Sequence, residues 1–126
     1  MASKLNINEI TELVIGSSFK IANTLGYGFV EKVYENSLTY ELRKAGLIVE
    51  QQIPVKVFYE GIIVGEFIPD LIVDKRLLVE LKAIRNLGDK EMIQCLNYLK
   101  ATQLKICLLI NFGTPKVEYK RIVNQF

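Results

Sequence analysis

Residues 67–83 read FIPDLIVDKRLLVELKA, and this stretch decides the fold. Two apolar segments flank the charged residues 74–76, which is the pattern of two antiparallel strands joined by a tight turn. A three-residue loop at 74–76 sets a register in which Asp70 lies directly opposite Glu80. Such residues have Cβ atoms about 5 Å apart on one face of a sheet, and Lys82 shares that face because side chains alternate. The sequence therefore predicts two carboxylates and an ammonium side by side in otherwise apolar strands.

This acidic cluster needs a compensating charge. Like charges directly opposite on a sheet are destabilising, and a buried charge is costly unless it is paired. Lys82 can balance one carboxylate, and a hard divalent cation such as Mg²⁺, which prefers oxygen ligands, would balance the rest. The interpretation depends on the loop, because a two-residue loop would turn Asp70 to the opposite face. The competing interpretation is a Glu-Lys pair on a solvated strand, but the apolar flanks of both segments argue against it.

The strand pattern extends upstream of this hairpin. Segments 48–59, 62–73 and 77–83 are rich in Val, Ile, Leu, Phe and Tyr, with turn signals at 60–61 and 74–76. We predict a meander of three antiparallel strands. Apolar residues occur on both faces around the last turn, so we expect the sheet to be covered on both sides.

Helical periodicity surrounds the meander. We expect helices at 9–24, 30–45 and 90–101 and further strands at 105–112 and 116–123. The first helix would be capped by Asn8. This order predicts an α/β fold in which a mixed central β-sheet, an antiparallel meander plus further strands, is flanked by helices. Because the chain has 126 residues and no linker or repeat, we expect residues 1–126 to form a single domain.

The composition excludes several classes of mechanism. The chain has no histidine, so Ser-His-Asp hydrolysis, Cys-His proteolysis and histidine-ligated zinc are excluded. Cys95 and Cys107 match no metal-ligand spacing, and we expect buried thiols in a reducing compartment. No segment has the pattern of a signal peptide or a membrane span, so we expect a cytoplasmic protein without a membrane partner. The net charge of +2 permits nucleic acid as a partner without indicating it.

Two helices carry polar side chains that could converge on the acidic cluster. Glu31, Tyr34 and Glu35 lie at i, i+3 and i+4 on the second predicted helix. Gln94 and Tyr98 lie four residues apart on the third. Each tyrosine could instead simply pack its helix onto the sheet. We expect Glu35 to lie on the solvated surface.

Residues 28–34, GFVEKVY, resemble the family named for its GxxExxY motif, and the resemblance extends through the hairpin to QCLNYLKAT and LLINFG. That family resembles a compact branch of the PD-(D/E)XK nuclease superfamily. The strand motif of the superfamily corresponds here to Pro69-Asp70 followed by Glu80-Leu81-Lys82. The resemblance implies a single restriction-endonuclease-like domain.

The resemblance also implies a metal site. Asp70 and Glu80 match the metal-binding carboxylates of the superfamily, and Glu31 matches an acidic residue that some branches supply from a helix before the sheet. With the carbonyl of Leu81, these residues would hold Mg²⁺ or Mn²⁺.

The implied activity is hydrolysis of phosphodiester bonds in DNA or RNA. Lys82 matches the catalytic lysine, and Gln94 and Tyr98 match a Q-x-x-x-Y helix motif of the exonuclease-like branch. The alternative is a binding module for nucleic acid or protein that keeps the nuclease fold without turnover. A third hypothesis is a structural subunit whose acidic cluster is an internal ion pair. Because the basic residues are diffuse, a homodimer or a partner protein is expected to enlarge the binding surface.

Overall fold

The computed structural model describes residues 3–124. The helices within that range are α1 (Ile7–Leu25), α2 (Glu31–Lys44) and α3 (Asp89–Thr102). The strands are β1 (Val49–Gln51), β2 (Val55–Tyr59), β3 (Ile62–Phe67), β4 (Leu71–Val73), β5 (Leu77–Lys82), β6 (Ile106–Asn111) and β7 (Glu118–Val123).

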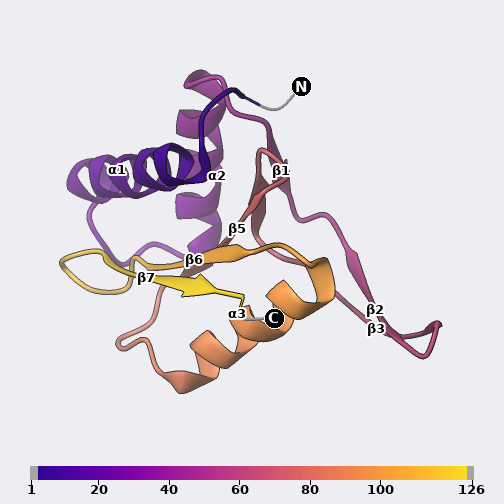
Figure 1. Cartoon of the computed structure of the whole chain (residues 1–126). Coiled ribbons are helices and arrows are strands. Elements are labelled where there is room, and N and C mark those ends of the chain that lie inside the picture. The colour runs from indigo at the N-terminus through magenta and orange to yellow at the C-terminus, as the bar shows by residue number, and fades with distance from the viewer. Residues whose placement is uncertain (1–2, 125–126) are drawn as a thin grey trace.

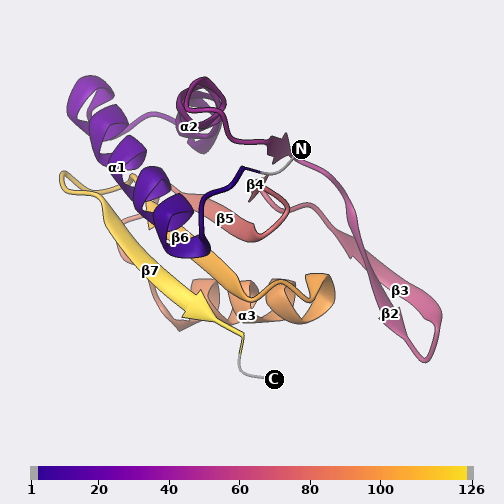
Figure 2. The ribbon, with the colours of Figure 1, turned by 45° about the horizontal axis from the view of Figure 1, so that its top comes forward.

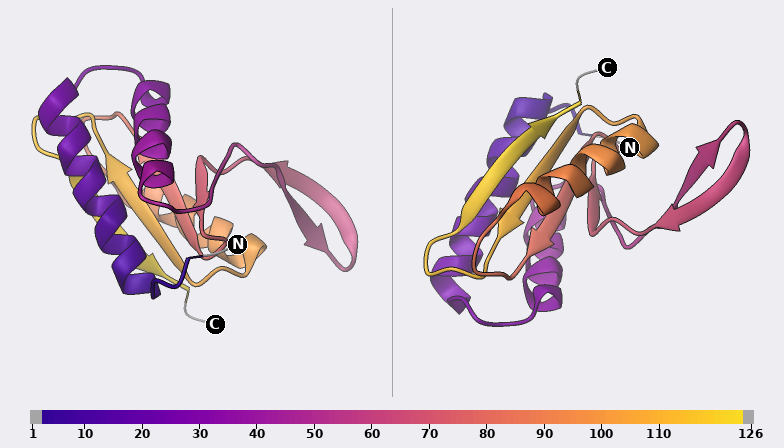
Figure 3. Two further views of the ribbon diagram at one scale, coloured as in Figure 1. Left: turned by 90° about the horizontal axis from the view of Figure 1, so that it is seen from above. Right: turned by 90° about the horizontal axis from the view of Figure 1, so that it is seen from below.

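A five-stranded mixed sheet forms the centre of the molecule, with strand order β1-β4-β5-β6-β7. Strands β5 and β6 run parallel, and the other neighbours run antiparallel. Helices α1 and α2 cover one face of this sheet and α3 covers the other (Figure 1 and Figure 3). The predicted α/β class is therefore confirmed.

The central strand β5 is buried on both sides, which explains its unbroken apolar sequence. Leu77, Val79 and Leu81 pack in the core beneath α1 and α2, whereas Leu78 packs with α3. Glu80 lies two residues beyond Leu78 and therefore projects to the α3 side of the sheet. The register thus places an acidic side chain between Leu78 and Lys82 on the face that α3 covers.

The turn at 74–76 sets this register as predicted, with Val73 paired to Leu77. Asp74 takes a left-handed backbone conformation with φ of 54°. Its fully buried carboxylate accepts a hydrogen bond from the backbone N–H of Ile48 at 3.1 Å. The loop of three residues is therefore held in place by a contact with the chain that leads into β1.

The predicted meander is wrong in its extent. Each of its first two strands is broken, and the outer halves, β2 and β3, form a separate two-stranded hairpin that projects from the body (Figure 2). We call this hairpin, residues 55–67, the arm. The breaks have local causes, because Gln52 is left-handed with φ of 54° and Pro54 and Pro69 have no backbone N–H for a ladder.

Helix boundaries differ from the predicted ones by a few residues. The cap of α1 is Asn6 and not Asn8, because Asn6 accepts from the backbone N–H of Glu9 at 2.9 Å while the Glu9 carboxylate accepts from Asn6. This reciprocal capping box was hidden by the overlapping Asn-Ile-Asn sequence. Cys95 and Cys107 are free and buried, as predicted. In the described part of the chain, no helix combines the length and apolarity needed to cross a bilayer.

Candidate functional site

Two carboxylates from neighbouring strands meet at one end of the central sheet. Leu71 pairs with Val79, and continuing this register by one residue places Asp70 opposite Glu80. Oε1 of Glu80 accepts a hydrogen bond from the backbone N–H of Asp70 at 2.8 Å. Oδ2 of Asp70 accepts one from the backbone N–H of Leu81, also at 2.8 Å. Each carboxylate is therefore held by the backbone of the opposite strand.

Burial makes this pair of acids reluctant to carry two negative charges. Glu80 is 4% exposed. Burial raises the pKa of Glu80 to about 8, and the charge of Asp70 adds to the shift. Burial also raises the pKa of Asp70 despite the opposing hydrogen bond from Leu81, and the charge of Glu35 adds to that rise. Such a pair favours binding of a proton or a cation.

A chain of hydrogen bonds links the end of β5 to α3. Nζ of Lys82 donates to Oε1 of Gln94 at 3.0 Å, and Nε2 of Gln94 donates to Oη of Tyr98 at 2.8 Å. Tyr98 stacks on Phe67 of β3 with ring centroids 4.0 Å apart. Burial raises the pKa of Tyr98, and the charge of Glu80 raises it further. The structure thus joins Lys82, Gln94 and Tyr98, which the sequence analysis grouped only by motif.

The residues of the GxxExxY stretch divide between the site and the core. Glu31 lies in the first turn of α2 and is exposed at the rim of the site. Burial raises its pKa, the charge of Lys82 lowers it, and the charge of Asp70 raises it. Tyr34 is fully buried, where it stacks on Phe112 at 4.4 Å and its hydroxyl donates to the backbone carbonyl of residue 26 at 2.7 Å. Tyr34 therefore packs α2 onto the sheet.

Glu35 is not the solvated residue expected from the sequence. It is 3% exposed. Its carboxylate accepts hydrogen bonds from Nζ of Lys32 at 3.0 Å and from the side-chain amides of Gln51 and Gln52 at 2.7 Å each. Nε2 of Gln52 also donates to Oδ1 of Asp70 at 3.3 Å, so it bridges two acids. The spacing of four residues from Glu31 was the available signal that Glu35 faces the site.

The donors near Asp70 fit a divalent ion that keeps much of its water. Among residues 3–124, no three Asp, Glu or Cys side chains gather into a ready-made metal cluster. In a β-strand, the N–H and the carbonyl of one residue point toward the same neighbouring strand. Because the N–H of Leu81 donates to Asp70, the carbonyl of Leu81 also points toward Asp70. Mg²⁺ is commonly held by one or two carboxylates, with water and phosphate completing its shell. Asp70, Glu80 and the Leu81 carbonyl match that pattern.

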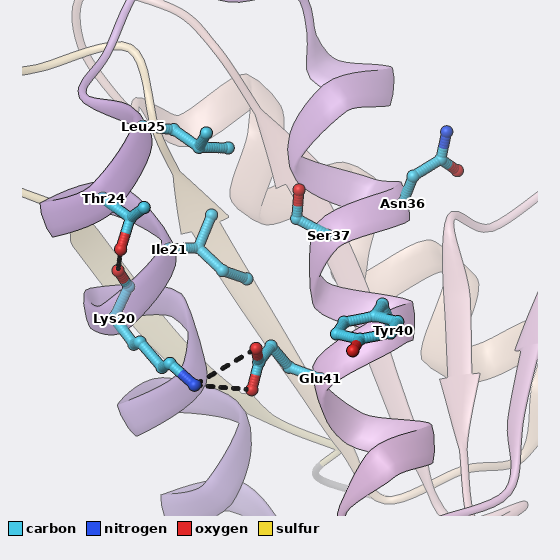
Figure 4. A pocket seen from close by; sticks show the side chains of 8 residues that line it. All are labelled: Lys20, Ile21, Thr24, Leu25, Asn36, Ser37, Tyr40 and Glu41. Carbon is cyan, nitrogen blue, oxygen red and sulfur yellow. Dashed lines mark hydrogen bonds and ion pairs between the residues drawn. The ribbon is translucent and has the colours of Figure 1, made fainter.

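A separate pocket lies between α1 and α2 (Figure 4). Its volume is about 520 Å³. Nζ of Lys20 donates to both carboxylate oxygens of Glu41 at 3.2 Å across this space. Because this charge is paired and none of the acidic-cluster residues lines the pocket, it offers no chemistry comparable with that around Asp70.

Comparisons with known proteins identify the family and a similar fold. Residues 8–122 match a family model described as "PD-(D/E)XK nuclease superfamily". No curated protein gives a significant match. A solved structure described as "Crystal structure of SSO0001" is similar, with a TM-score of 0.58 and 15% sequence identity over 94% of this chain. This chain covers 60% of the length of that protein, and the similarity concerns the fold alone.

Proposed function

Since the chain belongs to the PD-(D/E)XK nuclease superfamily, we propose that it is a metal-dependent phosphodiester hydrolase acting on DNA or RNA. Its mixed sheet between two helical layers is a restriction-endonuclease-like fold. Nucleases of this superfamily generally use divalent metal ions. The observation that carries the proposal is the reciprocal bonding of Asp70 and Glu80 beside Lys82.

The proposed ion is Mg²⁺ or Mn²⁺, held by Asp70, Glu80 and the carbonyl of Leu81, with Glu31 approaching from the rim. When bound, such an ion polarises a phosphoryl oxygen and lowers the pKa of an attacking water. The raised pKa values of Asp70 and Glu80 support this assignment, because a cation removes the repulsion that raises them. The hydrogen bond from Leu81 holds one oxygen of Asp70 at this end of the sheet, while its other oxygen accepts from Gln52.

The remaining residues have roles that follow from their contacts. Lys82 would orient the attacking water and stabilise the negative charge that develops on the phosphate. Gln94 holds the ammonium of Lys82 through its side-chain oxygen, and Tyr98 fixes the amide of Gln94. Gln94 and Tyr98 would therefore set the position of Lys82 and of the scissile phosphate.

The test is cleavage of a panel of single- and double-stranded DNA and RNA with Mn²⁺. Wild type should cut at least one class, and Lys82→Ala should lose the activity while still binding the metal. Lys120→Ala, which removes an exposed lysine from β7, is the matched control and should retain cleavage. Only activity that disappears in Lys82→Ala counts, because contaminating nucleases would cut equally in both preparations.

A second candidate function is a module that binds nucleic acid or protein without turnover. Wild type that binds Mn²⁺ and nucleic acid but cuts none of the panel would support this module and exclude the autonomous hydrolase.

We also propose the finer assignments that the sequence suggests. The chain would belong to the GxxExxY branch, on the evidence of Gly28, Glu31 and Tyr34. It would act in the cytoplasm, where the free thiols of Cys95 and Cys107 stay reduced. A second copy or a partner protein would extend its binding surface.

A further inference from the structure

A groove separates the arm from α3. Its volume is about 680 Å³, and it lies between Val57 and Phe58 on the arm and Asn97 and Lys100 on the helix. Phe58 lines the groove and is nevertheless 61% exposed. A two-stranded hairpin is only marginally stable in water by itself, so the arm gains from a contact that covers its apolar side chains. An exposed aromatic ring beside an open groove is a surface on which a ligand could make that contact.

The groove shares Tyr98 with the candidate site. Tyr98 and Phe67, which stack on each other, form its inner wall. The same Tyr98 accepts the hydrogen bond from Gln94, which in turn holds Lys82. A chain whose phosphate lies at Lys82 would therefore meet the groove as its next segment.

The chemistry of the groove identifies the class of ligand. Phe58 offers an exposed ring, Asn97 offers an amide, and Lys100 contributes a positive charge. No acidic side chain among the described residues lines it. Unpaired bases stack on aromatic rings while lysines contact the backbone, whereas a duplex keeps its base faces covered.

We propose that this groove binds the single-stranded segment of a nucleic acid next to the cleaved phosphodiester, with a base stacked on Phe58 and a phosphate on Lys100. The proposal rests on the proposed function, which it makes more specific. It assigns the arm a role in substrate binding, and it predicts preference for single-stranded or frayed substrates over intact duplex.

The test is the affinity for fluorescein-labelled oligothymidine and oligouridine of 12 nucleotides, measured by anisotropy in EDTA so that metal-dependent cleavage cannot intervene. Because stacking contributes roughly 1–3 kcal/mol per base, Phe58→Ala should weaken binding by about tenfold. Lys100→Gln should reduce the salt slope of log K by about 0.7, the value for one contact with single-stranded phosphate. Tyr40→Ala and Lys44→Gln, an exposed ring and lysine on α2, are the matched controls and should bind as wild type.

Several results would overturn the proposal. Wild type would bind neither labelled single strand, or Phe58→Ala and Tyr40→Ala would lose equal amounts of oligonucleotide affinity. An unlabelled duplex that displaces the labelled strand as well as an unlabelled single strand does would also contradict it. A wild-type dimer that dissociates in Phe58→Ala, with unchanged oligonucleotide affinity, would assign the arm to a second copy instead. The proposed hydrolase can fail independently of the groove. If Phe58→Ala loses binding and wild type shows no cleavage, the groove and the binding module are supported. If wild type cleaves and Phe58→Ala cleaves equally well, the hydrolase is supported and the groove is rejected.

Discussion

At the scale of single residues, Glu80 shows how the fold prepares the site. Its carboxylate is buried on the face of β5 that packs against α3, between the apolar Leu78 and the charged Lys82. The hydrogen bond from the N–H of Asp70 holds the group in place but does not offset burial and the neighbouring charge, so its pKa rises to about 8. Without a cation, Glu80 is therefore protonated at neutral pH.

This protonation predicts a pH dependence of stability. The folded protein binds a proton on Glu80 that the unfolded chain, with the ordinary pKa of 4.5, releases. The resulting stabilisation is fully present below about pH 4.5 and is lost as the pH rises through about 8. In EDTA, the free energy of unfolding in urea should fall by an amount of the order of a few kcal/mol between pH 5 and 9.

Glu80→Gln should flatten that pH profile, since the amide cannot ionise. Glu12→Gln, which changes an exposed residue of α1, should retain the wild-type slope. A Glu80→Gln protein whose slope equals that of wild type would show that Glu80 is ionised throughout and that burial does not control its charge.

Gln52 is a second residue whose role can be measured. Its backbone has a left-handed conformation with φ of 54°, and its side-chain amide nitrogen donates to both Glu35 and Asp70. Gln52→Ala should lower the free energy of unfolding by about 1–3 kcal/mol, because hydrogen bonds to charged groups are lost. Gln103 has a similar φ of 63°, but its side-chain amide donates to the uncharged backbone carbonyl of Lys100 in α3.

Gln103→Ala is therefore the control for the backbone effect and should cost less than about 1 kcal/mol. Urea unfolding at pH 8 measures both. Equal losses in the two variants would mean that the left-handed backbone, and not the bridge between carboxylates, accounts for the effect.

At the scale of elements, the parallel strands β5 and β6 are fastened together just beyond Lys82. The fully buried Asn111 accepts from the backbone N–H of Ile84 at 3.0 Å and donates to its carbonyl at 2.9 Å. Gly113 follows, and a Cβ at that position would lie 2.2 Å from the carbonyl oxygen of Ile84. This close approach of two backbones fixes the segment that carries Lys82.

Gly113→Ala should therefore destabilise the protein by about 3 kcal/mol, at the upper end of the cost of overpacking, because backbone has to move. Gly16→Ala is the matched control, since a Cβ in the middle of α1 meets nothing within 4 Å. That variant should be neutral or more stable by up to about 1 kcal/mol, as expected for alanine in a helix. Thermal and urea unfolding give the comparison, and equal stability of the two variants would contradict the close approach.

The elements also show where sequence reasoning succeeds. The turn at 74–76 has charged residues between two apolar segments, so its length and the resulting pairing of Asp70 with Glu80 could be predicted locally. The separation of the arm from the central sheet could not be predicted, because the apolar pattern of residues 55–67 fits a central strand as well as a projecting hairpin. The burial of Glu35 also escaped prediction, because it depends on the side chains of Gln51, at the end of β1, and Gln52, just beyond it, folding back onto α2.

At the scale of the whole molecule, the candidate site gathers the ends of several elements around Asp70. Strand β5 contributes Glu80 and Lys82, α2 contributes Glu31, and α3 contributes Gln94. Clustered acids repel one another, whereas a ligand that binds only the folded state stabilises it by mass action. A metal concentration tenfold above Kd should add about 1.4 kcal/mol to the free energy of unfolding.

The most direct test of the central claim is the melting temperature with and without Mn²⁺ at pH 7, for wild type, Asp70→Asn and the matched surface variant Asp89→Asn. We expect Mn²⁺ to raise the melting temperature of wild type and Asp89→Asn by several degrees, and Asp70→Asn to lose most of that rise. Asp70→Asn should also be as stable as wild type, or more so, in EDTA, because a neutral amide replaces a carboxylate whose charged form is disfavoured by burial. An unchanged wild-type melting temperature with Mn²⁺, together with a loss of stability in Asp70→Asn in EDTA, would contradict the metal site and identify the acidic cluster as a structural ion pair.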